Sequence, residues 1–329
     1  MSTGAGTGRH SPRRGESPTL SARKGQRTQS IPLLMPHPAP WIGYEDLLAL
    51  LRDRTVAVLS GAGVSTESGI PDYRGPETRD EERSPIRYGA FVESERTRRH
   101  YWARSAVGWP SFEAARPNAG HRALAALEAA GPVNGIITQN VDRLHQAAGS
   151  QRVIELHGAL AEVVCLDCGR LSGRGALQSR LLDLNPDWTD RAAERAPDGD
   201  ADLPRHATRD FRVPDCRACG GPLKPNVVFF GENASPNRVE AAWSLLSEAD
   251  ALLVTGSSLT VYSGFRFVRG ADQAGRPIGI VNLGETRGTP LASVHVDGRT
   301  GEVLPRLAEA LNGSAPAPLS ADPSPDPVE

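Results

Sequence analysis

The stretch from Ser60 to Gly75 reads SGAGVSTESGIPDYRG, and it follows an apolar run, Thr55–Leu59, that is typical of a buried strand. A strand that breaks into Gly-Ala-Gly and then into small hydroxylated residues can bring backbone N–H groups against a phosphate. Beyond this cradle, Asp72, Tyr73 and Arg74 add an acid, an aromatic ring and a cation. The stretch therefore predicts a site that contacts the reactive end of a bound cofactor as well as its phosphates.

The same pattern of a strand that ends in polar residues occurs three more times along the chain. The strand-like runs and the polar segments that follow them are Gly135–Ile137 with Thr138–Asp142, Ala251–Val254 with Thr255–Ser258, and Ile278–Val281 with Asn282–Gly284. Helical patterns, notably His121–Ala130 and Arg238–Ala249, lie between some of these runs. This alternation predicts an open, Rossmann-like parallel sheet of the α/β class, in which all four loops line one crevice at the carboxyl ends of the strands.

Two segments interrupt the alternation, and the two ends of the chain differ in composition from the rest. Their composition predicts a disordered tail over 1–36, a Rossmann-like domain over 37–160 and 224–311 with a helical insertion at about 77–118, a small zinc-binding domain over 161–223, and a second disordered tail over 312–329. Within the helical insertion the helical pattern is strongest around Phe91–Ala103.

The overall composition argues against two classes of partner. The 329 residues are 39% hydrophobic and 23% charged, as in ordinary globular proteins, and the formal net charge is −2. This charge gives no general attraction to nucleic acid or anionic lipid, and no apolar run approaches the roughly 20 residues that cross a bilayer. We therefore expect neither nucleic acid nor membrane as a partner and a cytoplasmic location. The alternative is an organelle matrix, because the first 36 residues are rich in Arg and poor in acids, as transit peptides are.

All four cysteines occur in two matched C-x-x-C-G turns, Cys165–Gly169 and Cys216–Gly220. Each turn directs two thiolates at one point, and four thiolates in a tetrahedral array suit a closed, structural Zn²⁺ site. The segment between the turns is longer than the usual spacer of roughly 15 to 20 residues, so an insertion must lie there. Two local disulfides and an iron–sulfur cluster are the alternatives.

The second polar loop carries the strongest candidates for chemistry. Gln139, Asn140 and Asp142 form a dense polar cluster, and His157 follows closely enough to reach the same crevice. A histidine near its unperturbed pKa of about 6.5 is a suitable base for a sugar hydroxyl. Considered alone, His157 can equally be structural, and Asp142 can be a helix N-cap.

Taken together, the motifs resemble those of the sirtuins, and in detail those of the class II branch. The resemblance covers about residues 41 to 311 and is carried by GAGVS and SGIPDYRG near 61–75, TQNVDRLH at 138–145, LHG at 156–158, the two cysteine turns, KPNVVFFGE at 224–232 and GSSL at 256–259. The glycine loop does not match the G-x-G-x-x-G fingerprint of dehydrogenases, because Thr66 stands at the third glycine position, and the resemblance to sirtuins is unaffected.

The resemblance implies NAD-dependent removal of an acyl group from lysine side chains of proteins or peptides, with nicotinamide and O-acyl-ADP-ribose as products. His157 would be the general base, Asn140 would orient the ribose, and Asp142 would contact the nicotinamide carboxamide. Protein mono-ADP-ribosyl transfer, lipoamidase activity in the same pocket and a non-enzymatic NAD-sensing zinc module are the rival functions.

The resemblance also implies which residues contact each ligand. NAD would contact Gly61, Ala62, Gly63, Ser65, Ile70, Asp72, Tyr73, Arg74, Gln139, Asn140, Val141, Asp142, Gly256, Ser257, Ser258, Asn282, Leu283, Gly284 and Thr300. The substrate would pair as an extended strand with Val228, Phe229, Phe230, Gly231, Glu232, Val261 and Tyr262. The alternative for Val227–Phe230 is a buried core strand. Tyr101 and Arg104 have the Y-x-x-R spacing with which some sirtuins hold acidic acyl groups.

Overall fold

The computed structural model describes residues 41–72, 85–188, 200–201 and 203–313, which all belong to one unit of the chain, Ala39–Glu329. The tails predicted to be disordered lie outside the described residues, except for Gly313 and Asn312. Tyr73 and Arg74 also lie outside them. Among the described helices, none combines the length and the apolar character that crossing a bilayer requires.

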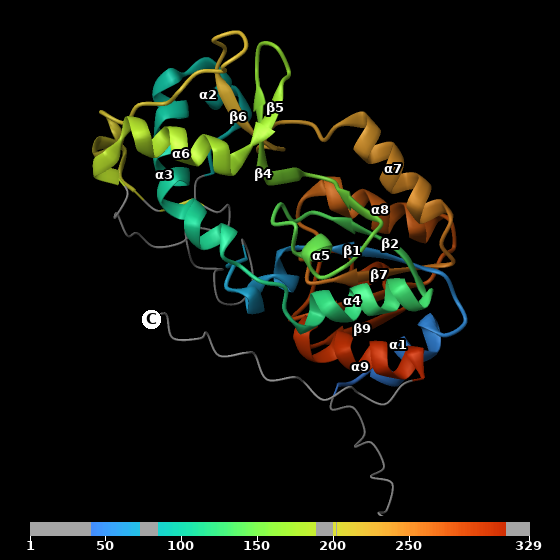
Figure 1. The fold of residues 1–329 in the computed structure, drawn as a ribbon. Coiled ribbons are helices and arrows are strands. Elements are labelled where there is room, and N and C mark those ends of the chain that lie inside the picture. Colours follow the sequence, from blue (N-terminus) through green and yellow to red (C-terminus); the bar gives the residue numbers. More distant parts are fainter. Residues whose placement is uncertain (1–40, 73–84, 189–199, 202, 314–329) are drawn as a thin grey trace, which may run out of the picture. The chain divides into compact units, whose positions relative to one another are not determined.

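A six-stranded parallel sheet forms the centre of this unit, as the alternating pattern predicts (Figure 1). Its strands lie in the order β3 (Val153–Glu155), β2 (Val133–Thr138), β1 (Val56–Ser60), β7 (Ala251–Thr255), β8 (Ile278–Asn282) and β9 (Val294–Asp297). The chain first adds strands on one side of β1 and then on the other, so the direction of winding changes between β1 and β7. Loops diverge at such a point and leave a crevice beyond the strand ends.

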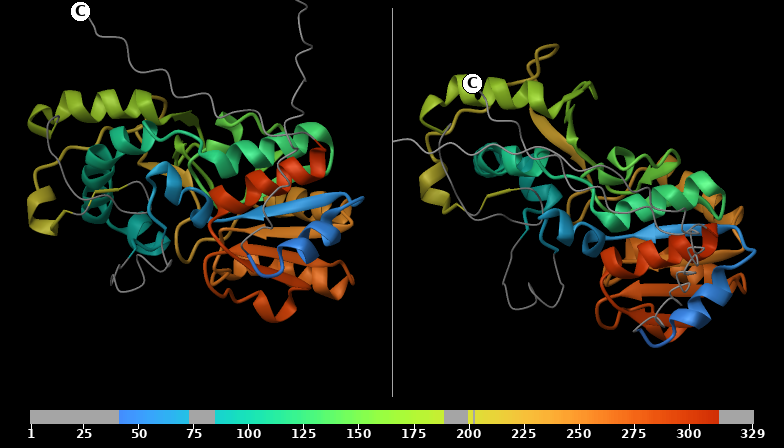
Figure 2. Two further views of the ribbon diagram at one scale, coloured as in Figure 1. Left: turned by 90° about the horizontal axis from the view of Figure 1, so that it is seen from below. Right: turned by 60° about the horizontal axis from the view of Figure 1, so that its bottom comes forward.

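Helices cover both faces of the parallel sheet (Figure 2). One face packs against α1 (Tyr44–Leu51), α4 (Ala119–Ala130) and α9 (Thr300–Asn312), and the other against α7 (Pro236–Ser247) and α8 (Tyr262–Gln273). Strand β1 shows the expected period of two, because Val56 and Val58 join the first cluster while Ala57 and Leu59 join the second. All five residues of β1 are buried.

A smaller antiparallel sheet follows β3 and contains the cysteine turns. It consists of β5 (Leu171–Gly173), β4 (Gly158–Cys165) and β6 (Leu223–Val227), in that order. Helix α6 (Arg174–Leu184) and two short 3₁₀ turns, η3 (Pro186–Trp188) and η4 (Arg205–Thr208), lie in the segment between the cysteine turns.

The described part of the helical insertion forms two helices, α2 (Tyr88–Glu93) and α3 (Glu95–Glu113), which include the helical patches expected around Phe91–Ala103. The break falls at Ser94, whose hydroxyl accepts a hydrogen bond from Thr97 N (3.2 Å) and caps α3. Phe91 and Trp102 from these helices share one buried cluster with Val163 and Phe211 of the cysteine-bearing segment. The two insertions therefore have a common hydrophobic core.

Short elements complete the loops at the carboxyl edge of the parallel sheet. Two 3₁₀ turns, η1 (Ala62–Val64) and η2 (Thr66–Ser68), follow β1, a short helix, α5 (Leu144–Ala147), follows β2, and η5 (Thr289–Leu291) lies between β8 and β9.

Candidate functional site

The loops after β1 and β7 approach each other so closely that only glycine fits at three positions. A Cβ on Gly61 would lie 2.7 Å from Ser257 Cβ, and one on Gly63 would lie 3.0 Å from Gly256 Cα. Gly256 has φ +58°, and its Cβ would lie 2.4 Å from Val64 N. Gly63 N donates to Gly256 O (2.8 Å) and fixes the contact. The glycines therefore join two strand ends into one backbone-lined wall.

A cavity of about 530 Å³ opens beside this wall. Of the residues expected from the sequence to contact NAD, those that line it are Gly61, Ala62, Gly63, Ser65, Ile70, Asp72, Gln139, Asn140, Val141, Asp142, Gly256, Ser257, Ser258, Asn282, Leu283 and Thr300. Gly284 is not among the lining residues; its N–H donates to Asp297 Oδ1 (2.8 Å) instead. The four loops thus border one crevice, as the strand pattern predicts.

A polar corner formed by Ser65, Asn140 and Asp142 lies in this cavity. Ser65 Oγ donates to Asp142 Oδ2 (2.6 Å), and Asn140 Nδ2 donates to Ser65 Oγ (3.1 Å) and to Gly61 O (3.0 Å). Asp142 Oδ1 accepts from Leu144 N (2.9 Å), but the N-cap of α5 is Arg143, so Asp142 lies one residue before the cap and the N-cap alternative is wrong. Burial raises the pKa of Asp142, which the bonds from Ser65 and Leu144 partly oppose.

Two buried histidines that the sequence analysis did not assign lie behind the polar corner. Asn118 N donates to His121 Nδ1 (3.4 Å), which leaves the proton on Nε2, 3.4 Å from Ser65 Oγ. The ring centroids of His145 and His121 lie 4.9 Å apart, and His145 Nε2 lies 2.8 Å from Ser60 Oγ. Burial lowers the pKa of His121 to about 4 and that of His145 to about 3. The N-x-x-H spacing of Asn118 and His121, which forms a capping box here, is a sequence pattern that can reveal this pair.

His157 lies at the cavity wall between two anchors. Nδ1 lies 3.0 Å from the carbonyl oxygen of Gln139, and Nε2 lies 2.7 Å from Ser263 Oγ. A pKa near the ordinary value of 6.5 was expected from the sequence, and this expectation is wrong, because burial lowers the pKa of His157 to about 4. The imidazole is therefore neutral at pH 7 and has one nitrogen able to accept a proton.

The expected substrate wall continues from β6. Val228 N donates to His157 O (2.8 Å), and Phe229 N donates to Glu232 Oε2 (2.8 Å). The strand ends at Val227, and Phe230 is 39% exposed, so the buried-strand alternative for Val227–Phe230 is wrong beyond Val227. Across the cavity, Val261 and Tyr262 are 41% and 54% exposed. Exposed apolar side chains on both rims suit a ligand that lies across the opening.

Tyr101 and Arg104 occupy different positions relative to the cavity. Tyr101 lines it and packs edge-to-face against Phe91. Arg104 is not a lining residue, and its guanidinium contacts the segment between the two cysteine turns. Its Nε donates to Ala201 O (2.8 Å), and Nη2 lies 4.0 Å from Asp200 Oδ2. Asp200 does line the cavity. In this structure Arg104 therefore has a positioning role for residues 200–201.

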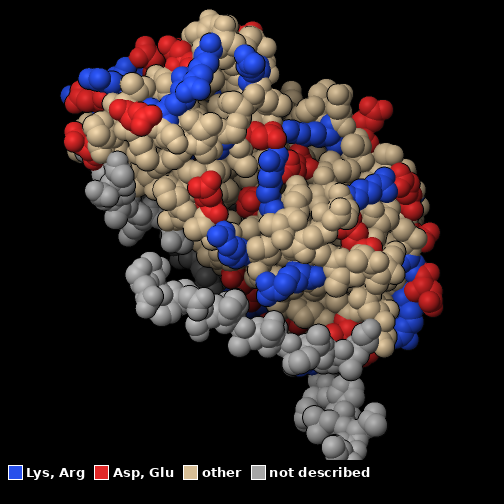
Figure 3. All heavy atoms as spheres, viewed as in Figure 1, with Lys and Arg blue, Asp and Glu red and all other residues tan. Residues whose placement is uncertain are grey.

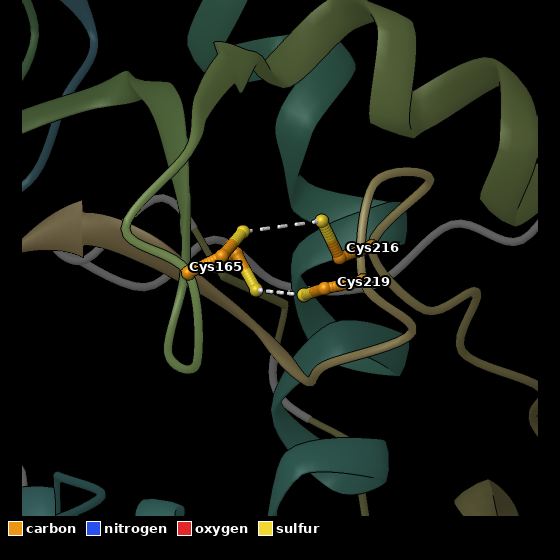
Figure 4. A group of neighbouring side chains, drawn as sticks. Cys165, Cys216 and Cys219 are labelled. Atoms are coloured by element: carbon orange, nitrogen blue, oxygen red, sulfur yellow. Dashed lines mark hydrogen bonds between the residues drawn. The ribbon is translucent and has the colours of Figure 1, made fainter.

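The four cysteine sulfurs form one cluster (Figure 4), in which all lie within 4.8 Å of one another. Cys165 Sγ lies 3.5 Å from Cys219 Sγ, and Cys168 Sγ lies 3.9 Å from Cys216 Sγ. Four ligands at a Zn–S distance of about 2.3 Å are separated from one another by about 3.8 Å, which fits this cluster. The alternative of two local disulfides is wrong, because all four thiols are free.

The charged side chains on the surface show no single sign. On the face shown in Figure 3, basic and acidic side chains lie intermingled over both sheets. Several form pairs, such as Arg143 with Glu155 (3.0 Å) and Arg152 with Glu248 (2.6 Å).

Comparison with known proteins places this geometry in context. Residues 61–263 match the family model described as the Sir2 family. NAD-dependent protein deacetylase 1 of Mycobacterium avium is 52% identical over 81% of this chain and 95% of that protein. The mitochondrial NAD-dependent protein lipoamidase sirtuin-4 of Bos taurus is 48% identical over 85% of this chain and 90% of that protein.

Solved structures give the same picture at lower sequence identity. A structure described as Sir2 with p53 peptide and NAD⁺ aligns with a TM-score of 0.66 and 32% identity, over 82% of this chain and 98% of that chain. A crystal structure of a Sir2 homologue in complex with NAD aligns with a TM-score of 0.63 and 31% identity, over 82% and 94% of the two chains.

Proposed function

We propose a detailed site for a chain that belongs to the Sir2 family and is an NAD-dependent protein deacylase. In this proposal the cavity beyond β1, β2 and β7 holds NAD, and His157 is the general base. The observation that carries the assignment is the state of His157. Its Nε2 has an available lone pair, and the ring lines the same cavity as the glycine loop and Asn140. A base must be neutral and within reach of the proton that it accepts.

Each polar residue of the cavity then has a definite task. Bound NAD supplies the sugar carbon that receives the acyl oxygen as nicotinamide leaves, and the ribose hydroxyls to which the acyl group passes. The amide of Asn140, held by Gly61 O and Ser65 Oγ, orients the ribose. Asp142 binds the carboxamide of nicotinamide, with Ile70 beside it. The Gly61–Gly63 wall and Ser257 face the phosphates.

We propose that the acyl-lysine peptide lies as an extended strand between residues 228–232 and residues 261–262. A solved Sir2 structure contains a p53 peptide, which supports peptide binding, and the exposed rims of the cavity support this position. Backbone pairing on both sides gives affinity with little demand on peptide side chains. Because the charges shown in Figure 3 are mixed in sign, we propose no nucleic-acid or membrane partner.

The cysteine cluster is consistent with one structural zinc ion bound by Cys165, Cys168, Cys216 and Cys219. Four thiolates leave no open coordination position, so the metal contributes stability rather than chemistry. For location we propose the cytoplasm, as the relatives include bacterial deacetylases, with an organelle matrix as the alternative, since sirtuin-4 is named mitochondrial. The first 36 residues, on which this choice depends, are outside the described part of the chain.

His157→Ala tests the assignment. We expect the variant to lose roughly 10²- to 10⁴-fold in the rate of O-acyl-ADP-ribose formation from NAD and an acyl-lysine peptide, the usual contribution of a positioned general base. His206→Ala, at an exposed position, is the matched control. Unchanged turnover in His157→Ala would show that the base is misassigned.

A panel of acyl-lysine peptides would identify which acyl group the enzyme removes. Lipoyl-lysine belongs in it beside acetyl-, succinyl-, glutaryl- and long-chain acyl-lysine, because one similar protein is named a lipoamidase. Incubation with labelled NAD separates the remaining rival, since label on protein indicates ADP-ribosyl transfer.

A further inference from the structure

We propose that Ser263 is a positioning residue for His157, whose hydroxyl donates to Nε2 in the resting site and accepts from that nitrogen once it carries a proton. This inference rests on the proposed function, because it takes His157 as the general base. Ser263 lines the cavity in the first turn of α8, directly after Tyr262. It is one of the two residues that the imidazole contacts through hydrogen bonds, the other being Gln139.

The partner on the other side of the ring determines the tautomer. Gln139 contributes its backbone carbonyl, 3.0 Å from Nδ1, and a carbonyl oxygen can only accept. Nδ1 therefore carries the proton of the neutral ring, and Nε2 carries the lone pair. Ser263 Oγ, 2.7 Å away, is then the donor to Nε2. One bond comes from the end of β2 and the other from the first turn of α8, and together they fix the rotation of the imidazole.

A hydroxyl is suited to both states of a base. For Nε2 to accept a proton from a sugar hydroxyl, the O–H of Ser263 must first turn away and release the lone pair. The Ser263 oxygen can then accept a hydrogen bond from the new N–H without losing its own proton. An acceptor for this N–H is especially important here, because the positive charges of Arg266 and Arg238 disfavour a positive charge on the ring. A hydrogen bond from a charged imidazole is stronger than one from a neutral imidazole.

The position of Ser263 is held by the packing of α8 against Gln139. The next residue, Gly264, touches the Gln139 side chain so closely that a Cβ would lie 2.3 Å from Oε1. Phe267 and Val268 anchor the same helix in the hydrophobic cluster on that face of the sheet. The helix that carries Ser263 thus packs directly against Gln139, whose carbonyl is the other anchor of His157.

Three variants separate this role from general support of the pocket. Ser263→Ala removes the hydroxyl, Ser263→Thr retains it, and Ser244→Ala removes a serine hydroxyl from the exposed side of α7 as the matched control. Two rates are measured for each: O-acyl-ADP-ribose formation, which needs the base, and exchange of labelled nicotinamide into NAD with acyl-peptide present, which precedes the step that needs the base.

We expect Ser263→Ala to slow O-acyl-ADP-ribose formation by roughly 10- to 100-fold, the effect of losing one bond to a charged group. Nicotinamide exchange should stay within about twofold, because the hydroxyl acts only through the base. Ser263→Thr should recover most of the rate, and Ser244→Ala should match the wild type in both measurements.

A measurement without cofactor checks the resting state. The ¹⁵N and ¹H chemical shifts of the imidazole, assigned by the signal that His157→Ala removes, report which nitrogen carries the proton. The wild type should show a single tautomer protonated at Nδ1. Ser263→Ala should keep this tautomer, which the Gln139 carbonyl fixes, but its Nε2 resonance should shift because the hydrogen bond from the hydroxyl is lost. Ser263→Thr should keep the wild-type resonance.

The outcomes distinguish the two proposals. A Ser263→Ala protein with wild-type turnover and an unchanged imidazole spectrum, or one that loses exchange and turnover in parallel, overturns the role of Ser263. So does failure of Ser263→Thr to recover turnover. If His157→Ala itself turns over normally, the proposed function fails, whatever the serine variants do.

Discussion

His121, His145 and His157 are kept neutral by burial, with pKa values lowered from 6.5 to about 4, 3 and 4. A buried imidazole cannot be solvated as a cation, so its neutral form is favoured. In the unfolded chain each ring is solvated and titrates near 6.5. The folded protein therefore binds fewer protons than the unfolded chain between about pH 4 and 6.5.

This difference predicts the direction of the pH dependence of stability. The contribution of each ring is fully present above pH 6.5 and is lost as the pH falls toward the folded value. Lowering the pH from 7 to 5.5 should cost roughly 1 kcal/mol of unfolding free energy per histidine, a few kcal/mol in all. Urea unfolding at a series of pH values measures this slope, and His157→Ala should reduce it by about a third. A flat profile in this range would contradict neutral burial of the three rings.

At the residue level, the sequence predicts where a functional side chain lies better than it predicts its protonation state or tautomer. The motif around His157 indicated that this ring reaches the crevice, but desolvation and the choice of tautomer arise from Gln139 and Ser263, which are distant in sequence. Ser263 has no motif of its own, and only the docking of α8 brings it to the ring. The glycines at 61 and 63 were identifiable because a close backbone approach leaves a direct trace in the sequence.

At the level of elements, the loop after β6 is held by a buried ion pair. Lys224 is 3% exposed, and its Nζ lies 2.9 Å from Glu232 Oε2 and 2.6 Å from Val227 O. Its ammonium also lies 4.7 Å from the ring centroid of Phe229. The same Glu232 oxygen accepts from Phe229 N. The ion pair therefore holds together the two ends of residues 224–232, the segment on which we propose that the peptide lies.

Replacing one partner should weaken peptide binding more than NAD binding. Glu232→Gln leaves the Lys224 ammonium buried without its counter-ion, and we expect a cost of about 1 to 3 kcal/mol in stability together with a rise in KM for the peptide. Glu248→Gln, which breaks the exposed pair with Arg152, is the control and should cost less than about 1 kcal/mol. Equal effects of the two variants, or a change in KM for NAD alone, would refute this account of the loop.

Elements with a strong pattern were predictable, and boundaries set by capping were not. The four strands that end in polar residues lie where their apolar runs indicated, because burial on both faces leaves a continuous hydrophobic signature. The break between α2 and α3 depends on Ser94 bonding to Thr97 N, a local choice that the polar composition of the segment conceals. Helix α4 likewise begins at Ala119 because Asn118 caps it.

At the level of the whole described unit, the two insertions are one structure. They interrupt the chain at separate places, so the sequence presents them as a helical module and a cysteine module. The structure gives them one core, in which Trp102 and Phe91 pack with Leu177, Phe211 and Cys165. Shared burial of this kind leaves no periodic trace, since each segment contributes only part of the hydrophobic surface.

This common core predicts what removal of zinc does. Two of the four cysteines, Cys165 and Cys216, are buried in the cluster, so repulsion between unliganded thiolates would act on the core itself. Structural zinc sites supply folding free energy on the order of 10 kcal/mol in small domains. We expect chelation, or Cys168→Ser, to loosen both insertions together while the parallel sheet remains folded.

Hydrogen exchange with mass spectrometry measures this directly, alongside metal content by elemental analysis. The untreated protein should contain one zinc ion per chain, and chelation should deprotect α3, α6 and β4 while β1 and β7 stay protected. Tyr101, on α3, lines the cavity, so deacylation should fall as well. Ser172→Ala, an exposed change on β5 beside the first cysteine turn, is the control and should leave zinc content and exchange unaltered. Protection of α3 that survives loss of the metal would show that the helical insertion is stable without the cysteine module.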